Sequence, residues 1–297
     1  MEKYFKDLEG SVSFNYNLKN SNWFNIGGSI DIYFKPKNLN DLIKLRKNLK
    51  NKDKLYLIGA GSNLLISDKG IKGIAVKLGE KFSNISKIDD TTLIAGAATT
   101  DKNLSEFAML NEITGFEFLS CIPGTVGGGI KMNSGCFENE FKDIIISIQA
   151  LDEDGRILSI PKEKIKFSYR NTDLNPNLIY LSATFKGQKS TKKKINEKIS
   201  AFKKMKEKSQ PSKIKTGGST FKNPLNQTQK KVWELIDESV DKNVKFGDAK
   251  ISNKHSNFFI NEKNASFDDM FNLINFVRDK VKKKTGIKLD LEVKILK

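Results

Sequence analysis

Glycine is concentrated at three points of this 297-residue chain, and that constrains its fold more than any other feature. The densest point is Ile122–Gly129, where one proline, four glycines and a threonine fall within eight residues. Glycine loses more conformational freedom on folding than any other residue, so such density indicates that something approaches the backbone closely. A diphosphate is the natural candidate for a ligand, and a tightly packed buried turn is the alternative.

A second glycine-rich stretch, Gly59–Asn63, follows directly after an expected strand. A dinucleotide-binding Rossmann turn would need a further glycine at position 64, but Leu64 stands there and begins an extended apolar run. The Rossmann interpretation therefore fails. The loop instead offers unhindered backbone N–H groups, with Ser62 and Asn63 as further partners for an anionic oxygen. A plain hairpin turn is the alternative.

The third stretch, Thr216–Pro224, has the form of a reactive loop. Two glycines expose the hydroxyl of Ser219, and Lys222 and Asn223 follow just beyond. A Walker A loop would need Gly-Lys-Ser/Thr, which the chain lacks. A serine-hydrolase elbow would need glycine at position 221, where Phe221 stands. Ser219 is therefore expected to serve another chemistry, or only to cap and turn the backbone.

The net charge is +17, from 52 lysines and arginines against 35 acidic residues. Only four of the basic residues are arginines, the side chain favoured for base edges and bidentate phosphate contacts, and the lysines are scattered. The composition therefore favours a solvated basic surface over a nucleic-acid partner.

The sequence also predicts a soluble cytoplasmic protein. No apolar run approaches the roughly 20 residues that cross a bilayer, and the first residues have no apolar stretch typical of a signal peptide. Two cysteines, Cys121 and Cys136, indicate a reducing compartment, and one histidine leaves too few ligands for a structural zinc site. No metal site is expected.

Apolar periodicity predicts an α+β fold, with a large mixed domain followed by a smaller one. Seven strands are expected before residue 190: Ile30–Phe34, Leu55–Ile58, Ile74–Leu78, Thr92–Ala95, Ile144–Ala150, Ile157–Ile160 and Leu178–Thr184. The expected helices are Asn40–Asn48, Asp101–Leu110, a lysine-rich connecting helix at Lys193–Lys208, one at Trp233–Val240, and one opened by Ser266 with Asp269 and closed by Gly286. A last strand is expected at Leu291–Leu296, with Leu291, Val293 and Ile295 on one face and Glu292 and Lys294 on the other.

Taken in order, motifs spread over nearly the whole chain resemble those of the UDP-N-acetylenolpyruvoylglucosamine reductase family. One such motif would be a weak signal, but six or more in family order are a strong one. The motifs are Asn25–Gly28, Gly59–Leu65, Ile122–Gly128, Met132–Gly135, Tyr169-Arg170, Gly217–Pro224, Gly247–Ala249, His255–Phe258 and Leu291–Val293.

The resemblance implies a two-lobed FAD-binding domain of the vanillyl-alcohol oxidase type, followed by a C-terminal α+β substrate domain. The expected parts are lobe 1 at 1–79, lobe 2 at 80–190, a connecting helix at 191–209 and the substrate-binding domain at 210–297. The N-terminal motif departs from the family, because Asn22-Trp23-Phe24 replaces its usual threonine-rich run. No tyrosine-bearing lid fits between Arg170 and Ser219, which places the chain in the branch without that lid.

The activity implied by the resemblance is NADPH-dependent reduction of UDP-N-acetylglucosamine enolpyruvate to UDP-N-acetylmuramate, a step of peptidoglycan precursor synthesis. The implied FAD is non-covalent, and the protein is expected to be a bacterial cytoplasmic monomer without nucleic-acid or membrane partners. Ser219 would be the proton donor, assisted by Arg170 and Glu292, and Lys222 and Asn223 would bind the substrate. The implied FAD contacts are Gly59, Ala60, Gly61, Ser62, Asn63, Leu64, Pro123, Gly124, Thr125, Gly127 and Gly128.

These residue types suit the implied chemistry. Hydride addition to the β-carbon of the enol ether moves negative charge onto the neighbouring carboxylate, and the fork of Arg170 fits a carboxylate. Glu292 is expected to be protonated, so that it donates a hydrogen bond beside the developing anion. Ser219 would then protonate the α-carbon. A flavin oxidase that shares the FAD loops and a basic nucleic-acid-binding protein are the competing interpretations.

Overall fold

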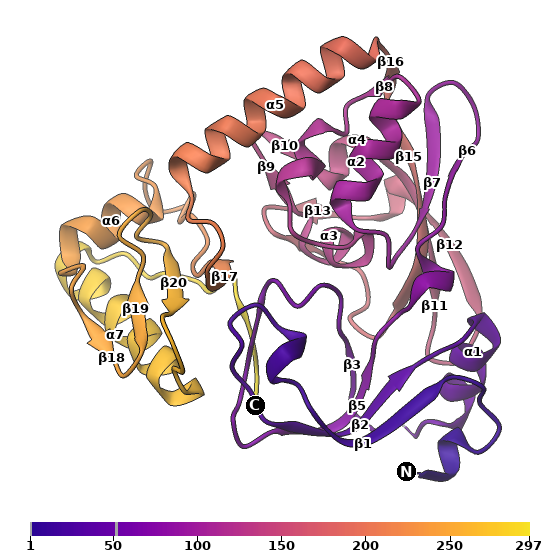
Figure 1. Cartoon of the computed structure of the whole chain (residues 1–297), viewed down its shortest axis with the longest axis horizontal. Helices are drawn as coiled ribbons and strands as arrows, with labels where there is room; N and C mark the ends of the chain where they lie inside the picture. The colour runs from indigo at the N-terminus through magenta and orange to yellow at the C-terminus, as the bar shows by residue number, and fades with distance from the viewer. Residues whose placement is uncertain (1, 51–52) are drawn as a thin grey trace. The chain divides into compact units, whose positions relative to one another are not determined.

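The computed structural model describes residues 2–50 and 53–297, which divide into two compact units (Figure 1). Unit 1 consists of the described residues within 1–14, 32–60 and 73–205, and unit 2 consists of 15–31, 61–72 and 206–297. The chain passes from one unit to the other five times, so neither unit is a continuous segment. Both contain helices and strands, which agrees with the expected α+β class.

The larger sheet of unit 1 has five strands in the order β12-β11-β15-β7-β6. Their bounds are β12 Ile157–Pro161, β11 Ile145–Leu151, β15 Ile179–Lys186, β7 Thr92–Gly96 and β6 Ile85–Lys87. All neighbouring strands are antiparallel. Helices α2 (Asp101–Leu110), α3 (Val126–Met132) and α4 (Phe141–Ile144) cover one face, where Leu104, Ile130 and Phe141 pack with strand residues such as Phe185 in one apolar core (Figure 1).

A second main sheet has the order β1-β2-β5-β3, and the division between the units falls within β1, β2 and β5. Its strands are β1 Ser11–Asn17, β2 Ser29–Lys35, β5 Ile71–Val76 and β3 Leu55–Leu57, and helix α1 (Leu39–Asn48) packs with them. Strands β3 and β5 are parallel, with Leu57 opposite Val76, so both end at the same edge of the sheet. The short remaining pairs of unit 1 are β8 Ile113–Thr114 with β16 Gln188–Lys189, β9 Gly135–Cys136 with β10 Asn139–Glu140, and β13 Phe167–Ser168 with β14 Asn171–Thr172.

Unit 2 contains a four-stranded antiparallel sheet and two helices. The sheet order is β17 (Lys215–Ser219), β20 (Phe258–Asn261), β19 (Ala249–Ile251) and β18 (Lys245–Phe246), and the helices are α6 (Val232–Ser239) and α7 (Phe267–Thr285). A separate parallel pair joins β4 (Leu64–Ile66) to β21 (Lys294–Leu296). The apolar core includes Phe24 and Leu65 from the first part of the chain, packed with Phe221 and Ile274.

Most helices agree with their predicted bounds because their signals are local. The Ser266 hydroxyl accepts from Asp269 N, and Gly286 ends α7 in the left-handed conformation. The connecting helix is α5 (Lys192–Ser209), whose Ile195 and Ile199 are buried. Among the described ranges, no helix is both long and apolar enough to cross a membrane.

Two expectations about elements are wrong. The glycine-rich stretch Ile122–Gly129 was expected to be a loop or turn, but Val126–Met132 is helix α3. The last strand is also shorter than Leu291–Leu296, because the chain changes partners within that segment. Leu291 bridges to Phe221, and only Lys294–Leu296 pairs with β4, so one alternating face does not run through the whole segment.

Candidate active site

The first predicted FAD loop begins where β3 ends, at Gly59 in unit 1. A Cβ at Gly59 would lie only 2.8 Å from Thr125 Oγ1, so glycine permits a close approach between this loop and the second one. The Thr125 side chain also caps α3 by accepting from Gly128 N at 3.4 Å. Gly59 and Thr125, which are 66 positions apart in the sequence, therefore bring the two loops together within unit 1.

The glycines of α3 have different physical reasons. A Cβ at Gly129 would lie 2.2 Å from the Phe141 ring, and one at Gly127 would lie 3.2 Å from Ala97. Packing within the protein explains both, as the buried-turn alternative proposed. Gly128 is exposed, and its nearest neighbour would be 3.6 Å away. Of the three, Gly128 is the glycine whose backbone is open to a ligand.

Asp101 lies buried beneath the second loop, and sequence reasoning did not single it out. Its backbone N donates to Gly124 O at 3.2 Å, and a Cβ at Gly124 would lie 2.5 Å from Asp101 Oδ2. Neither carboxyl oxygen has a hydrogen-bond partner among the described residues. Burial raises the pKa of Asp101 well above its usual value, which favours the neutral acid.

The second half of the first loop, Gly61–Leu64, belongs to unit 2. Gly61 has φ +71°, and a Cβ there would lie 2.1 Å from Ser21 O. Trp23 N donates to Gly61 O at 3.0 Å, and the buried Asn22 Nδ2 donates to Ile26 O at 2.8 Å. The segment that departs from the family's threonine-rich run therefore supports this loop through its own backbone and an internal amide contact.

Ser219 ends strand β17, in unit 2, after a distortion of the β17–β20 ladder. Gly218 has φ +77° and meets nothing within 4 Å, whereas a Cβ at Gly217 would lie 2.4 Å from the ring of Phe24. The paired glycines therefore serve two purposes: one allows Phe24 to pack closely, and the other turns the backbone just before Ser219.

The backbone beyond Ser219 is fixed by the buried Asn257. Its Oδ1 accepts from Phe221 N at 2.9 Å, and its Nδ2 donates to Phe221 O at 2.8 Å. Asn257 O also accepts from Thr220 N at 2.8 Å. This explains the His255–Phe258 motif in physical terms, because its asparagine holds the backbone that carries Ser219.

Glu292 is tied to the same place by its backbone. Glu292 N donates to Thr220 O at 2.9 Å, and Glu292 O accepts from Asn63 Nδ2 at 3.0 Å. Lys294 N in turn donates to Asn63 O at 3.0 Å. Within unit 2, the fold therefore brings together the segments of Ser219, Glu292 and the first predicted FAD loop.

Positive charge gathers beside Glu292. Lys294 is exposed. Desolvation lowers its pKa first and the charge of Lys222 lowers it further, while Glu292 opposes the shift. Asn223 Oδ1 accepts from Val232 N at 3.0 Å and so fixes the start of α6. Two cations, Lys222 and Lys294, together with one carboxyl suit an anionic ligand. The expected contacts of Lys222 and Asn223 with substrate stay a prediction.

Arg170 lies in unit 1 and contacts the Met132–Gly135 motif. Its Nη2 donates to Gly135 O at 2.7 Å, and its Nη1 is 3.6 Å from Glu140 Oε1. Asn133 Nδ2 donates to the same carboxylate at 3.0 Å. Arg170 also has φ +55°, which is uncommon for a residue with a side chain and recurs at functional sites. Ser219 and Glu292 belong to unit 2, so the grouping of all three side chains stays a prediction.

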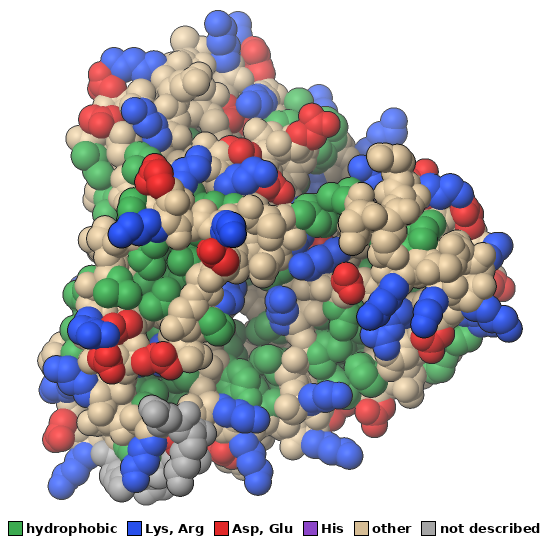
Figure 2. Space-filling view, turned by 180° about the vertical axis from the view of Figure 1, so that it is seen from behind, with side chains coloured by type: hydrophobic (Ala, Val, Ile, Leu, Met, Phe, Trp, Pro, Cys, Tyr) green, Lys and Arg blue, Asp and Glu red, His purple; other side chains and the backbone are tan. Residues whose placement is uncertain are grey.

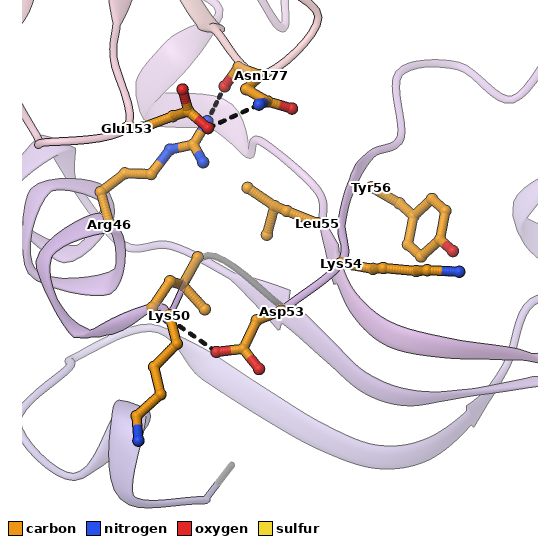
Figure 3. A pocket seen from close by; sticks show the side chains of 9 residues that line it. Arg46, Lys50, Asp53, Lys54, Leu55, Tyr56, Glu153 and Asn177 are labelled. Carbon is orange, nitrogen blue, oxygen red and sulfur yellow. Dashed lines mark hydrogen bonds between the residues drawn. The ribbon is translucent and has the colours of Figure 1, made fainter.

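A charged cavity of about 340 Å³ lies at the beginning of β3, where Lys54, Leu55 and Tyr56 are among the residues that line it (Figure 3). Arg46 Nη2 donates to Asn177 O, and Asn177 Nδ2 donates to Glu153 Oε1 at 2.6 Å. None of the residues predicted to bind FAD or substrate lines this cavity.

The loop geometry fits FAD. Gly59 and the exposed Gly128 present backbone that a larger side chain would obstruct, and the loops meet at Thr125. A family model described as an FAD binding domain matches residues 30–161, and one described as the C-terminal domain of UDP-N-acetylenolpyruvoylglucosamine reductase matches residues 210–296.

Whole-length relatives give the same result. The UDP-N-acetylenolpyruvoylglucosamine reductase of Pelagibacter ubique (strain HTCC1062) is 55% identical, covering 100% of this chain and 98% of that protein. The reductase of Rickettsia canadensis (strain McKiel) is 42% identical, covering 97% and 96%. The crystal structure of the reductase from Thermus caldophilus matches with a TM-score of 0.82 and 26% identity, covering 98% of this chain and 100% of that one. The resemblance inferred from the motifs is confirmed: this chain belongs to the UDP-N-acetylenolpyruvoylglucosamine reductase family and carries an FAD-binding domain.

Proposed function

We propose that this chain is an FAD-dependent reductase that converts UDP-N-acetylglucosamine enolpyruvate to UDP-N-acetylmuramate at the expense of NADPH. Family membership supports the reaction. The observation that supports the assignment to named residues is the backbone hydrogen bond from Glu292 N to Thr220 O, because it pairs the segment of Glu292 with the neighbour of Ser219 within one unit.

Arg170, Ser219 and Glu292 would each have a different role in the reaction. When bound, FAD would supply the hydride chemistry for reduction at the β-carbon of the enolpyruvyl group, with NADPH as the reductant. Arg170 would hold the carboxylate on which negative charge develops, a kind of contact typically worth about 3 kcal/mol or more in the transition state. Ser219 would donate the proton that completes reduction at the α-carbon, and a protonated Glu292 would donate a hydrogen bond beside it.

The surroundings of Arg170 support a positioned guanidinium. Gly135 O and the Glu140 carboxylate hold its two terminal nitrogens, and the Tyr169 ring lies 4.9 Å from its central carbon. A guanidinium held in this way loses little freedom when it meets a substrate carboxylate. The ion pair with Glu140 also gives Arg170 a structural role, which is compatible with the proposed binding of the substrate carboxylate.

Partners and organisation follow as further parts of the proposal. We expect a monomeric cytoplasmic enzyme with no nucleic-acid or membrane partner, in which 1–79 and 80–190 serve the flavin and 210–297 serves the substrate after the 191–209 linker. Figure 2 shows lysines and arginines spread over the visible face with acidic side chains among them, rather than one continuous basic surface. That distribution suits small anionic ligands better than a nucleic-acid duplex.

Replacing Ser219 with alanine tests the assignment. We expect Ser219→Ala to keep flavin reduction by NADPH, while reduction of the enolpyruvyl substrate falls at least ~10²-fold, the low end for a positioned acid. The two half-reactions are measured separately by stopped-flow absorbance of the flavin. Ser86→Ala, at an exposed position of β6, should leave both unchanged.

Two outcomes would count against the proposal. Equal losses in both half-reactions would remove Ser219 from the proton-transfer step. A yellow protein that turns over with oxygen on small alcohols or sugars, and ignores the enolpyruvyl sugar nucleotide, would instead be a flavin oxidase.

A further inference from the structure

Lys77 follows directly after strand β5, at the same sheet edge as the first predicted FAD loop. Ile58 N donates to Val76 O at 3.0 Å, which continues the parallel β3–β5 pairing to the point where both strands end. The Lys77 ammonium donates to the carbonyl of Gly59. The carboxyl edge of parallel strands is the usual place for a ligand in open sheets, because loops and unpaired backbone groups converge there.

The electrostatic surroundings of Lys77 lack a compensating acid. Its side chain is half-buried, and its pKa is lowered first by burial and then by the positive charge of Lys35. Within the described residues, no carboxylate forms an ion pair with Lys77, and its ammonium contact is the Gly59 carbonyl. Buried charges in proteins are normally paired, so a half-buried cation beside a second cation is a place where an anion is strongly stabilised.

We propose that Lys77 is a further cofactor-binding residue whose ammonium binds the diphosphate of FAD. The inference rests on the proposed role of Gly59 and Ala60 as part of the FAD loop. An ammonium has three donors, so Lys77 can hold the Gly59 carbonyl with one and reach phosphate oxygens with the others. The diphosphate is the anionic part of FAD, and lysine serves phosphate as a compact point charge.

The experiment compares FAD with riboflavin, which lacks the diphosphate. Both are titrated into the full-length apoprotein, and binding is followed by flavin fluorescence. We expect Lys77→Gln to weaken FAD binding by about 10- to 100-fold, the range for one lost charge-assisted contact, and to leave riboflavin binding unchanged. Lys77→Arg should stay within a few-fold of the wild type.

Lys54→Gln is the matched control. It removes the same charge from an exposed side chain at the beginning of β3, beside the cavity of Figure 3. A general effect of net charge would weaken FAD binding equally in Lys54→Gln and Lys77→Gln, and that result would overturn the proposal. We expect Lys54→Gln to bind FAD like the wild type.

Other results are equally decisive. Unchanged FAD binding in Lys77→Gln, or an equal loss for FAD and riboflavin, would remove Lys77 from the diphosphate. If Lys77→Gln does not fold, the wild type still tests the proposal: salt dependence of FAD binding no steeper than that of riboflavin binding would overturn it, because salt screens a lysine–phosphate contact. A wild-type chain that binds no FAD would refute the proposed function itself, whereas normal FAD binding with an indifferent Lys77 refutes only this inference.

Discussion

Asp101 shows how one buried acid can make stability depend on pH. Its pKa is raised by burial, so the native state retains a proton that the unfolded state releases above about pH 4. Between the unfolded and native pKa values the native state binds more protons, and the free energy of unfolding therefore falls as pH rises. Above the native pKa the loss is complete.

Asp101→Asn removes this titration while keeping a neutral group of similar shape. We expect the variant to gain stability relative to the wild type as pH rises from 4 toward 7, since only the wild type has to retain the extra proton. Urea unfolding at several pH values measures the difference. Asp279→Asn, at an exposed position of α7, should show no such trend. A constant difference between Asp101→Asn and the wild type would mean that Asp101 is ionised in the folded protein.

Helix α3 contains two neighbouring glycines, Gly128 and Gly129, whose surroundings differ. A methyl group at Gly129 would enter the Phe141 ring, whereas one at Gly128 would have only an ordinary contact, with Thr125 Oγ1 at 3.6 Å. We expect Gly129→Ala to destabilise the apoprotein by about 1–3 kcal/mol through overpacking. Gly128→Ala should stabilise it by about 0.5–1 kcal/mol, because alanine restricts the unfolded chain and favours the helix.

Gly128→Ala and Gly129→Ala also distinguish an effect on packing from an effect on FAD binding. If FAD approaches the Gly128 backbone, Gly128→Ala should weaken FAD affinity although it stabilises the apoprotein, and Gly129→Ala should do so only as far as it loosens α3. Thermal unfolding without flavin and fluorescence titration with FAD give the two quantities. An equal or larger loss of stability in Gly128→Ala would show that this position is packed rather than open.

The elements that sequence reasoning predicted well carry their signals in neighbouring residues. Ser266, Asp269 and Gly286 define both ends of α7 within the helix itself. Helix α3 was missed because glycine is a poor helix former. Only the folded protein shows that the Phe141 ring leaves no room for a side chain at Gly129. The segment 291–296 was predicted too long because its change of partner depends on β4, more than two hundred residues earlier.

Like the helices and strands, the candidate site could be predicted from the sequence only in part. Motifs predicted roles for Ser219, Glu292 and Arg170 that stay predictions, and within unit 2 the backbone of Glu292 pairs with Thr220, next to Ser219. Lys77 and Asp101 were missed because neither lies in a distinctive motif. Their significance comes from burial and from missing acidic or hydrogen-bonding partners in the part of the chain that the structure describes, and those properties exist only after folding.

At the scale of the whole molecule, the repeated passage of the chain between units decides which parts can fold alone. Residues 206–297 supply most of unit 2, but its core also contains Phe24, Ile26 and Leu65, all almost completely buried. Strand β21 likewise has its parallel partner, β4, in the first quarter of the chain. A fragment 206–297 would leave these contacts unmade.

We therefore expect the isolated fragment 206–297 not to unfold cooperatively. Losing one large buried side chain typically costs about 2–5 kcal/mol, and three such losses exceed much of the roughly 5–15 kcal/mol that stabilises a domain. Denaturant unfolding followed by circular dichroism, with the amide dispersion of a proton NMR spectrum, measures this. In the full chain, Phe24→Ala should lower the free energy of unfolding by about 3–5 kcal/mol and leave the protein folded. A fragment with dispersed amide signals and a sharp transition would mean that the helices and the β17–β20–β19–β18 sheet form a sufficient core without the early segments.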